Sequence, residues 1–141
     1  MAFPSTVTFA LGSNLGNREN NIKVALNMLD IALGSHFTAL SPVVETRAIG
    51  FDGADFLNCV VRYSSCKSPS TILAICKHIE QQMGRTDTPE YAEDGSRIYH
   101  DRIIDIDILT YGKRKIHTEE LVIPHPQVES RPYIKELLLH L

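Results

Sequence analysis

Residues 102–111 read RIIDIDILTY and form the clearest β-strand in the sequence. Alternate side chains of a strand point to opposite faces of its sheet, and here isoleucines alternate with aspartates. We therefore expect Ile104, Ile106 and Ile108 to face the core, while Asp105 and Asp107 point together to the other face. The two carboxylates then lie about 7 Å apart.

The chain before this strand alternates between short β-prone runs and stretches with helical spacing of apolar residues. Strands are predicted at residues 7–11, 38–46 and 56–63, and helices over 22–33 and 72–83. Gly34 ends the first helix, and Ser68 with Pro69 begins the second as an N-cap followed by proline. This order predicts an α+β fold, the ferredoxin-like split βαβ sandwich, with two helices packed on one face of a mainly antiparallel sheet.

Two segments flank the aspartate strand. After it, a turn at residues 112–114 predicts a hairpin into residues 115–118, and a short helix is expected from about Tyr133. Before it, residues 85–101 are polar and carry no sustained hydrophobic pattern. A loop this long in a small domain indicates either a functional lid, mobile until ligands bind, or a disordered excursion.

Composition limits the class of protein. The chain has 141 residues, of which 43% are hydrophobic and 22% charged, the profile of a single globular domain over residues 1–141. Its net charge of −3 gives no overall attraction to nucleic acid or to an anionic membrane. An anionic ligand must therefore be bound by individual side chains of a local site and not by the overall charge of the protein.

The remaining sequence features favour an intracellular protein. Three unclustered cysteines make a zinc site or a disulfide framework a poor interpretation. We find neither an apolar stretch of the roughly 18 residues that a membrane helix needs nor a signal-peptide pattern at the N-terminus. We expect a cytoplasmic monomer that binds neither nucleic acid nor membrane.

The aspartate pair is the main candidate for chemistry. Two carboxylates on one strand face repel each other unless a cation lies between them, and Mg²⁺ prefers such oxygen ligands together with substrate phosphates. Arg85 and Arg102 flank the long polar loop, as a pair of phosphate-binding arginines would. A solvated strand face with solubilising arginines fits the same residues, so this reading stays open on spacing alone.

Five motifs occur in one order along the chain: LGSNLGNR (11–18), FLN (56–58), IE through GR (79–85), RIIDIDIL (102–109) and IPHP through RPY (123–133). In this order they resemble the hydroxymethyldihydropterin pyrophosphokinases of folate synthesis, from about residue 6 to residue 134. The resemblance implies the ferredoxin-like fold. It also implies magnesium-dependent transfer of pyrophosphate from ATP to 6-hydroxymethyl-7,8-dihydropterin, with release of AMP.

The resemblance also implies a role for each matched residue. Asp105 and Asp107 match carboxylates that hold two Mg²⁺ ions, and Arg85 and Arg102 match catalytic arginines that engage the ATP phosphates. Phe56 and Tyr133 match aromatic residues that sandwich the pterin. The remaining implied contacts are Thr46, Ile49 and Asn58 with the pterin, and Glu80, Ile108, His125 and Arg131 with the nucleotide.

Two other functions are compatible with parts of the pattern. A Mg²⁺-dependent nuclease could use the same aspartate pair, but the chain lacks a basic track to hold a polyanion. A ferredoxin-like RNA-binding module would need exposed sheet aromatics in a basic setting, whereas this sheet face carries two aspartates.

Overall fold

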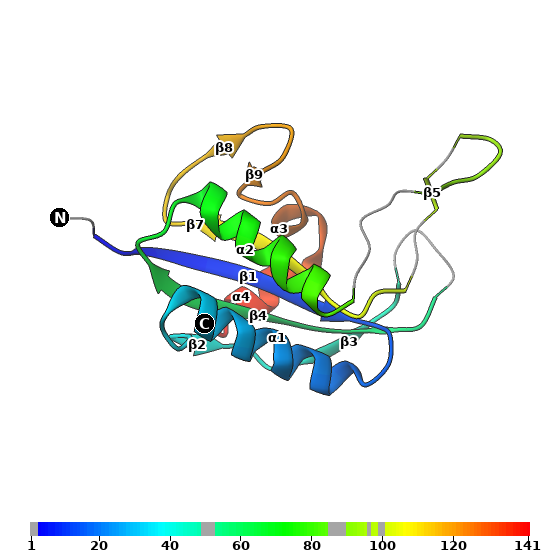
Figure 1. The fold of residues 1–141 in the computed structure, drawn as a ribbon, viewed down its shortest axis with the longest axis horizontal. Coiled ribbons are helices and arrows are strands. Elements are labelled where there is room, and N and C mark those ends of the chain that lie inside the picture. The colour runs from blue at the N-terminus through cyan, green and yellow to red at the C-terminus, as the bar shows by residue number, and fades with distance from the viewer. Residues whose placement is uncertain (1–2, 49–52, 85–89, 96, 99–100) are drawn as a thin grey trace.

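The computed structural model describes residues 3–48, 53–84, 90–95, 97–98 and 101–141. Strands and helices alternate along the first two thirds of the chain, and two short helices lie near its end (Figure 1). In chain order the elements are β1 (Ser5–Ser13), α1 (Arg18–Leu33), β2 (Ala39–Leu40), β3 (Val44–Thr46), β4 (Phe56–Ser65), α2 (Pro69–Gln82), β5 (Glu90–Tyr91), β6 (Arg97–Ile98), β7 (Asp105–Tyr111), β8 (Ile116–His117), β9 (Val122–Ile123), α3 (Gln127–Ser130) and α4 (Pro132–Leu138).

The main sheet has five strands, all paired antiparallel. Its order is β2-β4-β1-β7, and β3 pairs with β4 beyond the end of β2. The helices α1 and α2 lie side by side on one face, and α4 lies behind the sheet (Figure 1). This is the α+β ferredoxin-like sandwich that the sequence predicts.

Local sequence signals begin and end the two long helices as expected. The side chain of Asn17 accepts a hydrogen bond from the backbone N–H of Asn20 at the start of α1, and Gly34 ends this helix with φ of 71°. Ser68 caps α2, and Pro69 occupies its first turn. Each end thus has the residue that its backbone geometry favours.

The isoleucines of β7 pack in the main core, as the alternation predicts. Ile104, Ile106 and Ile108 are buried with residues of α1 and α2. The register between β1 and β7 then shifts at Thr8/Phe9, and Leu109 belongs to a second core cluster with residues of α4. The helix α4 therefore covers part of the face to which Asp105 and Asp107 point.

Three predicted elements need correction. Residues 38–46 form two strands because Pro42 has no N–H to continue the ladder. The Ser41 side chain instead accepts a hydrogen bond from the backbone N–H of Val60.

The hairpin predicted from β7 into β8 is wrong, since β8 pairs with β9. The free edge of β7 is used instead by the backbone N–H of His125, which donates to the Leu109 carbonyl. Within 85–101, β5 and β6 form a short antiparallel pair.

No helix in the described ranges is long and apolar enough to cross a bilayer.

Candidate active site

Three strands bring small and polar residues into register. Asn58 of β4 lies opposite Gly12 of β1, and Gly12 lies opposite Asp105 of β7. In the neighbouring row Ala10 lies opposite Asp107. Because adjacent strands are about 4.8 Å apart, the asparagine and the aspartate at the ends of the first row are separated by about 10 Å. Gly12 places no side chain between them.

A cavity of about 160 Å³ lies over this row. Its lining combines strand residues with side chains from the segment of α3 and α4, which are distant in sequence. Eight predicted site residues line it: Thr46, Phe56, Asn58, Arg102, Asp105, Asp107, Arg131 and Tyr133. The fold therefore brings these eight residues, predicted for the pterin, the metal and the phosphates, into one place.

One end of the cavity suits a flat ring with a polar edge. The Asn58 amide nitrogen donates to the Thr46 hydroxyl over 2.6 Å. The Asn58 amide oxygen lies above Gly12, 2.9 Å from the position that a Cβ would take there. Phe56 and Tyr133 add aromatic surface to the same lining. A fixed amide beside aromatic rings is the combination that binds planar heterocycles.

The other end holds the two carboxylates. Arg102 donates to Asp105 over 2.9 Å, and the side chains of these residues are 24% and 25% exposed. The Gln127 amide nitrogen donates to Asp107 over 3.0 Å. Within the described ranges, no three His, Cys, Asp or Glu side chains cluster around a possible metal position. Two carboxylates that leave the other positions to phosphate and water fit Mg²⁺.

A second cavity, of about 350 Å³, lies between α2, β7 and the segment around β9. Glu80, Ile108 and His125, three of the four residues predicted to contact the nucleotide, line it. The fourth, Arg131, lines the first cavity instead. Asp107 lines both cavities, so the two sites adjoin at this residue.

Two residues of the second cavity are held by the backbone. The buried Glu80 carboxylate accepts from the N–H of Ile106 over 2.9 Å, which ties α2 to β7. His125 Nδ1 accepts from the backbone N–H of Gln127 over 3.1 Å, so the neutral ring carries its proton on Nε2.

Burial, together with the charges of Glu80 and Asp107, raises the pKa of the Cys76 thiol, which also lines the second cavity. This cysteine stays protonated beside the carboxylates.

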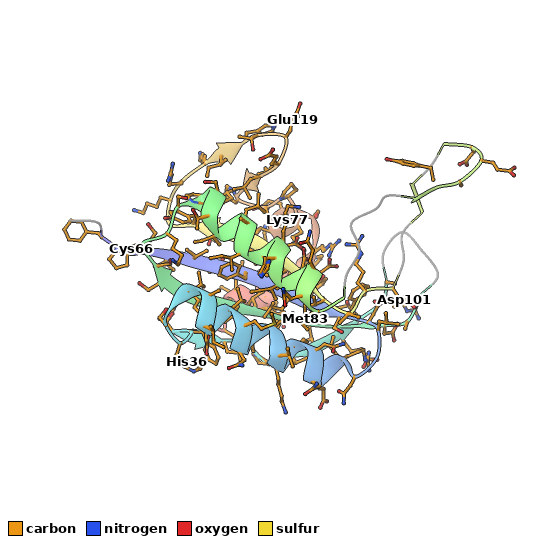
Figure 2. All side chains as sticks on the ribbon, in the orientation of Figure 1. His36, Cys66, Lys77, Met83, Asp101 and Glu119 are labelled. Carbon is orange, nitrogen blue, oxygen red and sulfur yellow. The ribbon has the colours of Figure 1, made fainter. Side chains whose placement is uncertain are left out.

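Asn14 joins the two loops that flank the first cavity. It is 3% exposed, and its amide nitrogen donates to the Ala54 carbonyl over 2.9 Å and to Asp101 over 2.8 Å. Its amide oxygen accepts from the backbone N–H of Arg102 over 2.6 Å. Asp101 lies where the sheet end meets the segment that carries β5 (Figure 2). The loop before Phe56 and the loop before Asp105 are thus fixed to one side chain.

Two of the predicted site residues, Ile49 and Arg85, lie outside the described residues. Part of the predicted lid does too: of residues 85–101, the structure describes 90–95, 97–98 and 101. Closure of this loop stays a prediction.

Sequence reasoning missed three residues of this region. Gln127 and Arg47 line the first cavity. Asn14 binds the two loops that flank it. Arg47 and Gln127 show no pattern that separates them from ordinary polar residues. The strand predicted at residues 7–11 continues through Gly12 and Ser13 in β1, so that Asn14 follows directly after the strand.

Comparison with known proteins gives one consistent result. Residues 8–141 match the model of the family described as 7,8-dihydro-6-hydroxymethylpterin-pyrophosphokinase (HPPK). A 2-amino-4-hydroxy-6-hydroxymethyldihydropteridine pyrophosphokinase of Porphyromonas gingivalis is 40% identical over 131 residues, which are 92% of this chain and 85% of that protein. A protein of the same name from Bacillus subtilis is 32% identical over 126 residues, 89% of this chain and 71% of that protein.

Some relatives are much longer. A "Folate synthesis bifunctional protein" of Arabidopsis thaliana is 40% identical over 136 residues, which are 96% of this chain but 26% of that protein. The chain therefore spans about a quarter of the length of the plant bifunctional proteins it matches.

Proposed function

The chain belongs to the 7,8-dihydro-6-hydroxymethylpterin-pyrophosphokinase family, and on this premise we propose that residues 1–141 form one domain that transfers the terminal pyrophosphoryl group of ATP to 6-hydroxymethyl-7,8-dihydropterin. The products are AMP and the pterin diphosphate, as in folate biosynthesis. The observation that carries the proposal is the pair of cavities that meet at Asp107. A reaction that joins two substrates needs two adjoining sites with the bond-forming groups at their junction.

The first cavity takes the pterin. Its ring lies over Gly12 between Phe56 and Tyr133, with its polar edge at Asn58. Because Asn58 already donates to Thr46, the amide oxygen above Gly12 accepts from an N–H of the pterin. The hydroxymethyl group then points along the row toward Asp105, about 10 Å from the asparagine. Ile49 belongs to the same proposal as a pterin contact.

The second cavity takes the nucleotide. Glu80, Ile108 and His125 line it, and the protonated Nε2 of His125 can donate to an acceptor of the nucleotide. Arg131, which lines the first cavity, engages the phosphates that extend past Asp107. This places the triphosphate across the carboxylate pair.

The family uses ATP generally with Mg²⁺, and we propose that Asp105 and Asp107 hold two ions. When bound, such ions neutralise the charge that develops on the phosphates during transfer. The chain's own residues prepare this arrangement. Arg102 donates to Asp105 over 2.9 Å; a metal ion held at that carboxylate would leave this guanidinium to engage phosphate oxygens, the role that we also propose for Arg85.

The reaction then depends mainly on alignment. The hydroxymethyl oxygen attacks the β-phosphorus and loses its proton, while the bond from that phosphorus to the oxygen bridging the α and β positions breaks and releases AMP. Phosphoryl transfer needs little covalent help, so the sheet contributes by fixing the acceptor, the phosphates and the arginines relative to one another. Closure of residues 85–101 would exclude water as a competing acceptor.

The test is direct. The protein is incubated with ATP, Mg²⁺ and 6-hydroxymethyl-7,8-dihydropterin, and AMP and the pterin diphosphate are measured in equal amounts. Absence of AMP from folded protein, or cleavage of oligonucleotides as the nuclease alternative requires, would refute the proposal. The monomeric state and the cytoplasmic location remain predictions, which light scattering and cell fractionation test.

A further inference from the structure

A chain of hydrogen bonds connects the carboxylate pair with one of the aromatic rings. The Gln127 amide nitrogen donates to Asp107 Oδ2 over 3.0 Å, and the Gln127 amide oxygen accepts from Arg131 over 3.2 Å. The same guanidinium nitrogen of Arg131 donates to the Tyr133 hydroxyl over 3.2 Å. Three contacts therefore run from the metal end of the cavity to its aromatic end.

The middle of this chain is well fixed. Gln127 is 5% exposed and is the first residue of α3, and its own backbone N–H bonds to His125. The amide lies between two charged groups of this hydrogen-bond chain, the carboxylate of Asp107 and the guanidinium of Arg131. Because a buried side chain has few rotamers available, displacement of the amide at one end moves the group at its other end.

The chemistry of an amide matters at this position. Gln127 donates to a carboxylate and accepts from a guanidinium at the same time, which neither a carboxylate nor an apolar side chain can do. The neutral amide thus joins the Asp107 carboxylate to the Arg131 guanidinium and orients Arg131 through two hydrogen bonds.

We propose that Gln127 is a positioning residue that couples Asp107 to Tyr133 through Arg131, so that occupation of the carboxylates by metal and triphosphate sets the ring against which the pterin stacks. The inference rests on the proposed function and deepens it. It assigns to Gln127 a role in pterin affinity although this residue contacts the pterin only through its neighbours.

The first experiment uses Gln127→Met, which keeps the length of the side chain and removes both hydrogen bonds. The dissociation constant of 6-hydroxymethylpterin is measured by fluorescence with saturating Mg²⁺ and α,β-methylene-ATP, in which the bond that must break is blocked. The constant should rise about tenfold, with kcat changing less than the pterin KM. Gln81→Met, the same change at an exposed position of α2, is the control and should leave the constant unchanged.

The second experiment separates coupling from simple damage. Gln127→Glu keeps the shape of the side chain and an acceptor for Arg131 but cannot donate to Asp107 when ionised, so it cuts the link to the carboxylate and should lose pterin affinity about as Gln127→Met does. Tyr133→Phe keeps the ring and removes the hydroxyl contact with Arg131. Combined with Gln127→Met, it should add little further loss, because the same chain is already broken.

Each outcome decides the matter. Unchanged pterin affinity in Gln127→Met or in Gln127→Glu, or fully additive losses when Gln127→Met is combined with Tyr133→Phe, would overturn the coupling role. These results are read against the unmodified protein, which must bind the pterin and form AMP. If it does neither, the proposed function fails, and this is distinct from a failure of the coupling. If Gln127→Met does not fold, Gln127→Glu alone decides: a loss of pterin affinity supports the link to Asp107, and no loss refutes it.

Discussion

Gly12→Ala should damage the pterin end of the cavity, although it adds only one methyl group near the end of β1. The new Cβ would lie 2.9 Å from the Asn58 amide oxygen, 3.5 Å from Phe56 Cδ1 and 3.8 Å from the Leu57 carbonyl oxygen. Only the first contact is too short. The substitution therefore tests the position of a single amide.

The magnitude follows from what holds that amide. An ordinary contact begins at 3.4 Å, so the Asn58 oxygen must move by about 0.5 Å. Its amide nitrogen is tied to Thr46 over 2.6 Å, and moving the group weakens this bond. Overpacking costs about 1–3 kcal/mol, and replacing a strand glycine by alanine returns about 0.5–1 kcal/mol. We expect a net loss of about 1–2 kcal/mol, or about 3–8 °C in Tm.

The assay combines stability with binding. Urea unfolding gives the free energy of unfolding for the unmodified protein, Gly12→Ala, Asn58→Ala and the double variant. In the Asn58→Ala background the short contact no longer exists, so Gly12→Ala should cost nothing or stabilise slightly. The pterin KM of Gly12→Ala should rise by about tenfold or more, because a displaced amide no longer meets the edge of the ring.

Two results would refute this reasoning. If Gly12→Ala destabilises the Asn58→Ala background as much as the unmodified protein, the contact with Asn58 is not the cause. If Gly12→Ala leaves the pterin KM unchanged while the protein is destabilised, the amide above Gly12 does not recognise the pterin.

Three further predictions concern other parts of the molecule. Asp107→Asn should reduce AMP formation by at least about 100-fold without lowering Tm, because it removes a metal ligand and relieves carboxylate repulsion; near-normal turnover would exclude Asp107 as a ligand. Asn14→Ala should lower the free energy of unfolding by about 2–4 kcal/mol in urea, because it leaves buried partners unsatisfied. A loss below about 0.5 kcal/mol, the range of ordinary surface substitutions, would show that the two loops do not depend on Asn14. Burial acts to raise the pKa of Asp30, but hydrogen bonds from Tyr63 and His36 outweigh it and lower this pKa. The stability that these bonds contribute is therefore present above the ordinary carboxyl pKa and is lost as the pH falls through the lowered pKa of Asp30. Tyr63→Phe should cost about 1–2 kcal/mol at pH 7 and progressively less below about pH 4, and a cost that does not change with pH would contradict this assignment.

The regular elements could be predicted because their signals are local. The alternation in β7, the helical spacing of apolar residues in α1 and α2, the glycine at the end of α1 and the cap at Ser68 each act within a few residues. Edge pairings could not be predicted in this way. The partner of β8 is decided by how the segment around His125 occupies the outer edge of β7, and no short stretch of sequence contains that information.

The candidate site could also be predicted only where its signals are local or belong to a family motif. The aspartate pair is visible in the strand pattern, and the aromatic and nucleotide residues were reached through ordered family motifs. Gln127 was not reached, because a glutamine after His-Pro carries no local signal for a bond to a carboxylate twenty residues earlier. The role of Asn14 could not be predicted for a similar reason: its partners come from two loops that lie 40 and 87 residues away.

The position of Gly12 explains why the site lies at this end of the sheet. Towards the other end of the same face, side chains of β1, β4 and β7 pack against α4, and Ala10, Val60 and Leu109 are buried there. At Gly12 the central strand has no side chain, so the face is hollow between β4 and β7. An asparagine on one neighbouring strand and an aspartate on the other then face each other across a gap of about two strand spacings. The same backbone that builds the core thus separates ring recognition from phosphate chemistry, and it fixes the distance between them without a loop.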